Sequence, residues 1–368
     1  MSRIKNILFS VTLLLLTTAC TVSPKTENIQ LNPETLHLAW KKDTGGAIQQ
    51  SPLSVKDVVV VMPGESLIST FDIESGESRW QFDTPAKLWP NSLSTTFDAV
   101  MIGGEGGRLA AMSARSGIGE WEIELKAEVL SPPLVDRYLV FAATSVVDFV
   151  EDQVSNQKAE LLAINASTGE ILWQHETANH ALVTPVRGGD IVYVGGSQGE
   201  TIRLYAFSTA EGELRWKYEV VDGAIDAIYA NDDAVALLGH QGSLTAIDAH
   251  SGSLLWRVEF VANVSWLTGW ENLIIFEDGA ALRAWDILSG ESVWEYQSLS
   301  KVVDQPILLD SELYLLTQAG EIINLNPQTG AESRRFSTDS ETPVGMIITQ
   351  GWLFIADEDG YLYAYTSQ

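Results

Sequence analysis

Few side chains in this sequence have the types and spacing that catalysis requires. The five histidines are scattered over 368 residues, and the two nearest in sequence, His175 and His180, are five residues apart on an expected strand-to-loop stretch. That spacing does not match the usual pairs of metal ligands. The phosphate-binding P-loop and the HExxH zinc motif do not occur. We therefore predict no catalytic residue, no bound cofactor and no enzymatic activity.

One acidic run, Asp357-Glu358-Asp359 before Gly360, could suggest a calcium site. The further spaced ligands of an EF-hand loop are missing, and the run coincides with a turn that recurs along the chain. We interpret it as a turn, with weak calcium binding as the alternative, and predict no metal site.

The charge of the chain restricts its partners. The sequence has 22 Lys and Arg against 49 Asp and Glu, a net charge of −27, and 45% of its residues are hydrophobic. A chain this acidic repels phosphate backbones, so nucleic acid is not expected as a partner. The hydrophobic content predicts a folded core. Solubility of a large β surface explains the acidity, and salt adaptation is the alternative.

The first twenty residues have the organisation of an export signal. Arg3 and Lys5 form a basic start, an apolar stretch runs from residue 7 to residue 16, and small residues precede Cys20. The apolar stretch is short for a membrane span, which favours a signal peptide over residues 1–19.

This start resembles the bacterial lipoprotein signal, in which a cysteine after small residues is lipidated and becomes the new N-terminus. The resemblance implies that Cys20, the only cysteine, carries the lipid and that residues 20–35 form a flexible tether. An ordinary signal with an incidental cysteine is the alternative. A single cysteine cannot form an internal disulfide.

A ten-residue phrase recurs along the chain, with a glycine four residues before its last position. That last position is tryptophan in six copies and arginine in the seventh: Trp80, Trp121, Trp173, Trp216, Trp256, Trp294 and Arg334. The intervals between these positions are 41, 52, 43, 40, 38 and 40 residues. A period near 40 predicts a propeller or a solenoid.

The residue types in the phrase explain the repeat. In the copy that ends at Trp294, Asp286 begins a turn and can accept hydrogen bonds from the backbone. Gly290 supplies a positive φ, and Ala284 leaves room for a neighbour. Trp294 is a flat anchor that can pack between adjacent units. The phrase therefore predicts docking of one β unit on the next.

The phrase resembles the tryptophan-docking motif of the quinoprotein-like (PQQ-repeat) β-propellers. The resemblance covers residues 36–368, and it implies that docking uses Trp40 as well as the tryptophans of the repeats. Trp40 lies 40 residues before Trp80 and belongs to a unit whose other strands are supplied by the C-terminal segment. We therefore predict an all-β fold: an eight-bladed β-propeller of four-stranded antiparallel blades, monomeric, with the ring closed by a composite N-/C-terminal blade.

Two apolar stretches are candidate partner surfaces. An insert over residues 145–159 separates the second and third strands of its blade and contains Val146, Val147, Phe149 and Val150. Trp266 precedes another strand. Exposed apolar patches mark partner sites. The alternatives are a longer hairpin that folds back on its blade and a tryptophan that fills the core.

The combination of a lipoprotein-type signal, a tether and a propeller resembles the scaffold lipoproteins of the machinery that inserts β-barrels into bacterial outer membranes. The resemblance implies a non-enzymatic protein-binding role, with the central subunit of that machinery as partner. The resemblance also implies a location at the periplasmic face of the outer membrane. In a cell that has no outer membrane, the implied location is the outer face of the cytoplasmic membrane. A generic lipid-anchored propeller is the alternative. A quinoprotein-type oxidoreductase is a further one, although the adjacent cysteines that many such enzymes carry are absent here.

Overall fold

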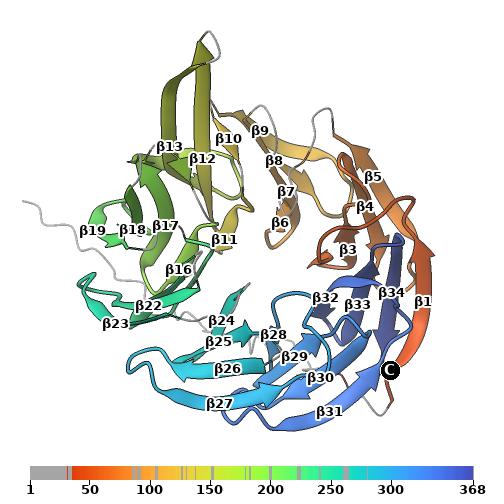
Figure 1. Ribbon diagram of the computed structural model, residues 1–368. Helices are drawn as coiled ribbons and strands as arrows, with labels where there is room; N and C mark the ends of the chain where they lie inside the picture. The colour runs from red at the N-terminus through yellow and green to blue at the C-terminus, as the bar shows by residue number, and fades with distance from the viewer. Residues whose placement is uncertain are drawn as a thin grey trace, which may run out of the picture.

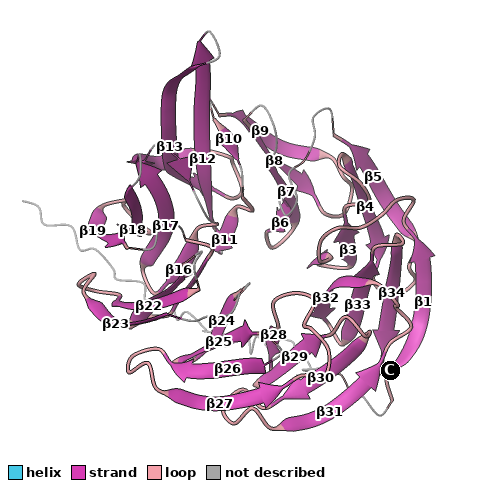
Figure 2. Ribbon diagram, in the orientation of Figure 1, coloured by secondary structure: helices cyan, strands magenta, loops and turns pink. Residues whose placement is uncertain are grey.

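Every secondary-structure element in the described part of the chain is a β-strand (Figure 2). The computed structural model describes Leu31 and residues 35–367, apart from 85–87, 89–92, 104–106, 126, 130, 137, 151–152, 179, 182–183, 199–200, 222–224, 240–241, 260–263, 265 and 280. Within these residues the strands form eight antiparallel sheets, which we number as blades 1–8.

The first four blades follow chain order from the innermost strand to the outermost. Blade 1 contains β2 (Leu53–Val55), β3 (Val58–Val61), β4 (Leu67–Asp72) and β5 (Ser78–Asp83). Blade 2 contains β6 (Leu93–Thr95), β7 (Ala99–Gly103), β8 (Arg108–Ser113) and β9 (Gly119–Glu124). Blade 3 contains β10 (Glu128–Val129), β11 (Leu134–Asp136), β12 (Leu139–Val150), β13 (Gln153–Asn165) and β14 (Ile171–Ala178). Blade 4 contains β15 (His180–Ala181), β16 (Val186–Gly188), β17 (Ile191–Gln198), β18 (Thr201–Ser208) and β19 (Leu214–Val220).

The remaining blades repeat this order, except that the last one joins the two ends of the chain. Blade 5 contains β20 (Ala227–Ala230), β21 (Ala234–Leu238), β22 (Ser243–Asp248) and β23 (Leu254–Glu259). Blade 6 contains β24 (Leu267–Trp270), β25 (Leu273–Asp278), β26 (Ala281–Asp286) and β27 (Ser292–Gln297). Blade 7 contains β28 (Ile307–Leu309), β29 (Glu312–Leu316), β30 (Glu321–Leu325) and β31 (Glu332–Ser337). Blade 8 contains β32 (Pro343–Thr349), β33 (Trp352–Asp357), β34 (Tyr361–Thr366) and β1 (His37–Asp43).

The eight blades stand around a ring, which confirms the predicted eight-bladed propeller (Figure 1). The core lies between blades. Every residue of β3 and of β21 is buried, because neighbouring blades cover both faces of these strands. The outer strands β5 and β9 alternate between exposed and half-buried residues, because only one of their faces meets a neighbour. This alternation is the period of two expected for a half-buried strand.

Each docking tryptophan lies against the turn of the following blade. The Trp256 indole of blade 5 packs on Gly290 of blade 6, where a Cβ would stand 2.8 Å from the ring. The Nε1–H of Trp256 donates to the carbonyl of Ile287 at 2.8 Å. Asp286 Oδ1 accepts the backbone N–H of Ser289 at 2.8 Å and fixes the turn. Glycine is therefore required at position 290 for two reasons: its φ is +72°, and the Trp256 ring approaches too closely for a Cβ.

The same contact recurs around the ring at seven interfaces. Seven tryptophan Nε1–H groups donate to a backbone carbonyl of the next blade, in the pairs Trp40–Ile73, Trp80–Ala114, Trp121–Ala166, Trp173–Thr209, Trp216–Ala249, Trp256–Ile287 and Trp294–Pro327. These bonds satisfy the only polar atom of each indole at the interface.

The composite blade has the register of the others. Trp40 of β1 lies opposite Ala364 of β34, as Trp294 lies opposite Ala284 in blade 6. Lys41 Nζ stands 3.8 Å from the ring centroid of Tyr361, a cation–π contact that ties the two ends of the chain together. The predicted closure by N- and C-terminal strands is confirmed.

The eighth interface, between blades 7 and 8, explains why Arg334 replaces tryptophan. Arg334 lies opposite Asn324 and so occupies the tryptophan register, but it is exposed. Four residues before Trp40 stands Leu36, at the position where the other blades carry glycine. A Cβ at the docking glycines would already meet the tryptophan ring of the preceding blade at 2.5–2.8 Å. A leucine at this position therefore excludes a tryptophan at position 334.

The insert of blade 3 is a lengthened hairpin. Strands β12 and β13 pair from Leu139–Asn165 to Val150–Gln153, with one irregularity after Asp148. On its flanks β10 reaches only Ser145 and β14 reaches only Ala159. The outer part is therefore a two-stranded ribbon, which projects beyond the ring in Figure 1.

Glu277 at the end of β25 is a buried carboxyl group between blades 6 and 7. It is 3% exposed and accepts the backbone N–H of Val302 at 3.2 Å. Burial raises the pKa of Glu277, while the hydrogen bond from Val302 and the charge of Lys301 act in the opposite direction. Burial of the charged form therefore destabilises the fold wherever Glu277 is ionised.

We expect Gly252→Ala to destabilise the ring far more than Gly279→Ala. Both glycines have φ near +70°, but a Cβ at Gly252 meets the Trp216 ring at 2.7 Å, whereas none lies within 4 Å at Gly279. The shared backbone strain costs about 1–2 kcal/mol, and displacement of the indole adds about 1–3 kcal/mol at Gly252. Urea unfolding checks this, and equal midpoints for the two variants would contradict it.

We expect Glu277→Gln to stabilise the protein at pH 7, because glutamine retains the acceptor for Val302 without a buried charge. The folded pKa is raised, so the penalty is present above that pKa and disappears as the pH falls through it. The melting temperatures of the variant and the wild type should therefore converge toward pH 4. A variant less stable than the wild type at pH 7 would show that the carboxylate itself is needed.

Candidate protein-docking surfaces

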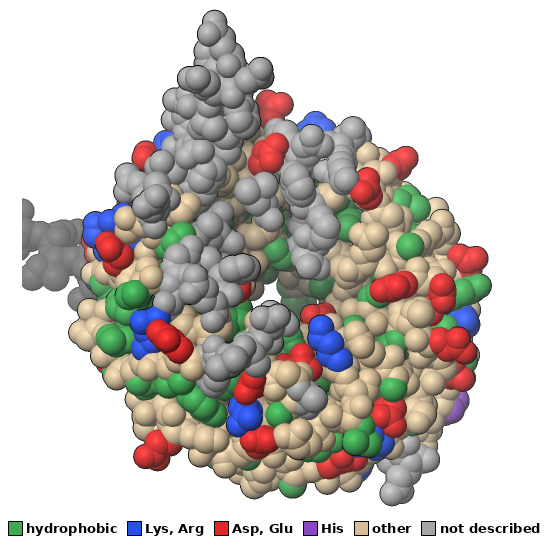
Figure 3. Space-filling model, viewed as in Figure 1, with side chains coloured by type: hydrophobic (Ala, Val, Ile, Leu, Met, Phe, Trp, Pro, Cys, Tyr) green, Lys and Arg blue, Asp and Glu red, His purple; other side chains and the backbone are tan. Residues whose placement is uncertain are grey.

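The two faces of the ring carry different turns. Because adjacent strands are antiparallel, the links between blades and the turns between second and third strands lie on one face, which we call the connection face. The turns that hold the docking glycines, between third and fourth strands, lie on the other, which we call the docking-turn face. Figure 3 shows one face of the disc, hollowed toward its centre.

The predicted partner residues of the insert lie on the connection face. Val146, Val147, Phe149 and Val150 all belong to β12, within the projecting ribbon. Their side chains lie outside the described part of the structure. Trp266 stands before β24 in blade 6, with blades 4 and 5 between it and the insert. The structure therefore does not bring the two predicted surfaces into one patch.

Trp266 is not the exposed anchor that one interpretation of the sequence expected. It is half-buried and packs against the cluster of blades 6 and 7 that contains Ile275 and Leu315. Its Nε1 is buried and has no hydrogen-bond partner among the described residues. This packing fits the alternative in which the tryptophan contributes to the core, while its role as a partner residue stays a prediction.

A second apolar surface was not predicted. Exposed aliphatic side chains begin the outer strands of four consecutive blades: Ile171, Leu172, Leu214, Leu254, Leu255 and Val293. We call this set the apolar rim. Hydrophobic side chains gather at the lower left of Figure 3, in the region of blades 5 and 6. Blade 1 has Ser78 and Arg79 at the matching positions. The sequence feature that could have predicted the apolar rim is the pair of residues before each docking tryptophan. This pair contains aliphatic residues only in some blades.

Charged pairs cover the outer strands. Arg203 and Glu219 of blade 4 approach within 3.3 Å, and Arg283 and Glu295 of blade 6 within 2.7 Å. In blade 7 hydrogen bonds from Arg335 lower the pKa of Glu332, and the bond from Tyr296 acts in the same direction. Exposed pairs of this kind contribute about 0–1 kcal/mol each, so they serve solubility more than stability.

Two of the titratable groups that the sequence analysis weighed, Asp357 and His175, have structural roles. Asp357 of the acidic run is 1% exposed and accepts the backbone N–H of Tyr361 at 2.8 Å, so it closes a turn. His175 stacks on Phe207 with ring centroids 5.5 Å apart. Among the described residues no three His, Cys, Asp or Glu side chains are grouped as metal ligands would be.

One further motif, Gly195-Gly196-Ser197-Gln198-Gly199, has the GxSxG spacing of a serine nucleophile. Such a serine acts from a sharp turn between a strand and a helix. Here Ser197 lies within β17 and pairs with Ile202 of the next strand, so the local geometry is a β-hairpin. His180 lies opposite Ser197, but its side chain is outside the described part. The motif therefore lacks the structural context that the chemistry needs.

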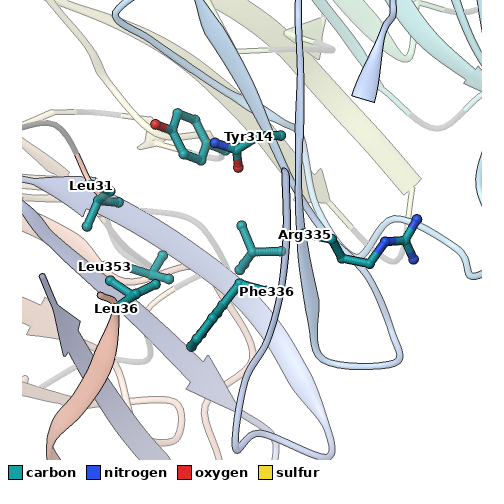
Figure 4. Close-up of a pocket in the computed structure, with 8 residues that line it drawn as sticks. Leu31, Leu36, Tyr314, Arg335, Phe336 and Leu353 are labelled. Atoms are coloured by element: carbon teal, nitrogen blue, oxygen red, sulfur yellow. The ribbon is translucent and has the colours of Figure 1, made fainter. Parts of the chain in front are cut away.

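Leu31 corrects the predicted boundary of the tether. Residues 20–35 were expected to be flexible, yet Leu31 is 3% exposed and belongs to the core cluster between blades 7 and 8. It lines a small pocket with Leu36, Tyr314, Ile322, Asn324, Arg335, Phe336 and Leu353 (Figure 4). The remaining cavity is about 10 Å³, roughly the space of one water molecule. The segment before β1 therefore adds two apolar side chains, Leu31 and Leu36, to the interface that has Arg334 in place of a docking tryptophan.

The export elements fall outside what the structure describes. Cys20 and the expected signal peptide belong to the residues that are not described. No helix among the described residues has the length and hydropathy needed to cross a bilayer.

Comparison with known sequences identifies the family. The family profile described as outer membrane protein assembly factor BamB matches residues 15–119, 93–227 and 157–368. Outer membrane protein assembly factor BamB of Yersinia pestis is 24% identical over 150 residues, which cover 40% of this chain and 38% of that relative. The aligned segment thus spans well under two thirds of the relative.

Solved structures share the fold at low sequence identity. BamB from Moraxella catarrhalis superposes with a TM-score of 0.62 and 18% identity, over 90% of this chain and 99% of that chain. A quinohemoprotein alcohol dehydrogenase from Comamonas testosteroni gives a TM-score of 0.66 and 13% identity, over 92% and 78% of the chains. These likenesses concern the propeller alone. The match of the profile from residue 15 to residue 368 shows that the chain belongs to the family of outer membrane protein assembly factor BamB.

Proposed function

We propose that this protein is a lipid-anchored, non-enzymatic scaffold that acts as BamB-type proteins do, in the assembly of β-barrel proteins of the outer membrane. The observation that carries the proposal is the family match over the whole propeller. The chain's own signal-like start and single Cys20 support export and lipid attachment.

The structure supports binding better than catalysis. The ring is held by seven repeated indole contacts, so it offers rigid edges and loops at fixed positions. Asp357 of the acidic run accepts a hydrogen bond that closes a turn, and His175 stacks on Phe207. A quinoprotein-type reaction has only the shared fold in its favour, and fold does not determine function.

The partner that we propose is the central subunit of the barrel assembly machinery, and the surface is the projecting β12–β13 ribbon. An isolated two-stranded ribbon is marginally stable in water. A partner that packs against it would bury apolar residues of the kind found at Val146, Val147, Phe149 and Val150.

We expect shortening of the ribbon to abolish partner binding and spare the fold. Replacing residues 147–157 with Asn-Gly joins Val146 to Lys158, which already lie opposite each other, by a two-residue turn. Recovery of the central subunit in a pulldown should fall about tenfold or more. A tenfold loss of affinity corresponds to about 1.4 kcal/mol of binding free energy. Circular dichroism and the melting temperature should stay at their wild-type values.

The matched control for this pulldown is Gln318→Ser, an exposed residue in the turn between β29 and β30 of blade 7 on the same face. Unchanged recovery with the shortened ribbon would remove the ribbon from the partner surface. Failure of the wild-type protein to recover any barrel assembly subunit would reject the proposed function itself.

Membrane attachment should depend on Cys20. We expect Cys20→Ala to release the protein from the membrane fraction and to leave the propeller folded. The measurement is fractionation of cells, together with the mass of the N-terminal peptide, which gains the acyl chains only when cysteine is present. A Cys20→Ala protein that still sediments with membranes would contradict lipid attachment as the anchor.

A further inference from the structure

Carboxylates gather at the inner edge of blades 4–6, in the turns between first and second strands. In blade 4 the carbonyl of Asp190 in this inner turn accepts the N–H of Thr209 in the docking turn at 2.8 Å, and blades 5 and 6 repeat the bond. The inner turns therefore lie on the docking-turn face. We call their exposed carboxylates the acidic arc: Asp190 in blade 4, Asp232 and Asp233 in blade 5, and Glu271 in blade 6.

The inner turns of these three blades contact one another in succession. The Asp232 carboxylate lies against Gly189, where a Cβ would stand 3.2 Å from its Oδ1. Asn231 Nδ2 donates to the carbonyl of Glu271 at 2.9 Å, which joins the turns of blades 5 and 6. The first strands β16 and β20, and likewise β20 and β24, approach with Cα atoms within 8 Å. This step is close to the spacing of about 7 Å between alternate side chains of an extended strand.

The acidic arc lacks the basic partners that the inner turns of blades 2 and 3 have. Asp98 of blade 2 lies 3.7 Å from Lys56 of blade 1. Asp136 of blade 3 pairs with Arg187 of blade 4 at 2.5 Å. Among the described residues no basic side chain forms an ion pair with a carboxylate of the arc. Unpaired charges of one sign, side by side, attract cations.

A buried hydroxyl group without a partner points toward the arc. Tyr193 of β17 is 0% exposed, and its hydroxyl has no hydrogen-bond partner among the described residues. Burial raises the pKa of Tyr193, and the charges of Asp190, Asp248 and Asp232 raise it further, so these carboxylates lie near the hydroxyl end of the ring. An unpaired buried hydroxyl destabilises the protein. A cationic group between the carboxylates can donate a hydrogen bond to the phenol oxygen.

We propose that the acidic arc binds an extended segment of a protein partner that carries lysine or arginine at every second position. Successive basic side chains then face successive blades, because one blade step matches two residues of the segment. A single metal ion does not account for the arc, since no three His, Cys, Asp or Glu side chains in the described part of the chain are grouped as its ligands would be. The proposal goes beyond the proposed function and uses neither the lipid at Cys20 nor the β12–β13 ribbon.

Two peptides of the same composition test the proposal. In the first, five lysines alternate with five serines, and in the second the five lysines form one block. Both carry fluorescein, and their binding to the purified protein is followed by fluorescence anisotropy in about 0.1 M salt, where the Debye length is about 10 Å. The arc variant combines Asp190→Asn, Asp232→Asn and Glu271→Gln.

The control variant removes the same charge elsewhere on the disc. It combines Glu74→Gln, Glu120→Gln and Glu341→Gln, three exposed carboxylates outside the arc. Both variants therefore have the same net charge, and any difference between them reports the position of the carboxylates.

We expect the wild type to bind the alternating peptide more tightly than the block peptide, because only the alternating lysines match the blade step. The arc variant should bind the alternating peptide about tenfold more weakly, since up to three ion pairs are lost together. The control variant should lose about twofold at most, because distant charges are screened. Tyr193→Phe should weaken binding about threefold, and its melting temperature should not fall, because the variant removes an unpaired hydroxyl.

Three results would overturn the proposal. Equal weakening in the arc variant and the control variant would show that the peptide responds only to the net charge of the chain. Equal affinity for the two peptides would remove the extended segment with alternating basic residues. Displacement of the alternating peptide by micromolar calcium would assign the arc to a metal ion. Neither Cys20 nor the barrel assembly machinery takes part in these measurements, so the proposed function can fail without changing their outcome.

Discussion

The contact on which the structure depends is a tryptophan indole laid on a glycine of the next blade. A Cβ at these glycines would meet the ring at 2.5–2.8 Å, so the position tolerates no side chain. The indole donates its N–H to a carbonyl in the same turn, and in several blades a carboxylate or amide at the start of the turn, such as that of Asp286 or Asn326, accepts backbone N–H groups and holds the turn. One contact therefore determines the residue types, the turn and the repeat period together. It also makes each blade depend on the blade that follows it.

This dependence is why most of the fold could be predicted from the sequence. The spacing of glycine and tryptophan is local, and repetition multiplies a weak signal until the number of blades can be counted. The sequence shows that arginine replaces tryptophan at position 334, but it does not show the reason for the replacement. Its cause is Leu36, which stands at the glycine position of a blade whose third and fourth strands come from opposite ends of the chain.

The candidate surfaces were harder to predict, because they depend on which side chains the neighbouring blades cover. The sequence places Trp266 beside a strand but does not show that blade 7 half-buries it. Leu31 sits in a polar stretch with two prolines nearby, and only the gap between blades 7 and 8 gives it a partner. The apolar rim arises from single aliphatic residues in separate repeats, which become neighbours only when the ring closes.

The pairing of β1 with β34 has a consequence for folding. Lys41 and Tyr363 meet across the whole length of the chain, so this sheet is the most non-local in the molecule. Contacts of such long range are slow to form. A chain in which β34 has not yet been synthesised and exported still has an open ring with two bare edge strands, and bare edges invite wrong pairing. Closure thus delays the N-terminal strand, because β1 has no place in a blade until β34 is present.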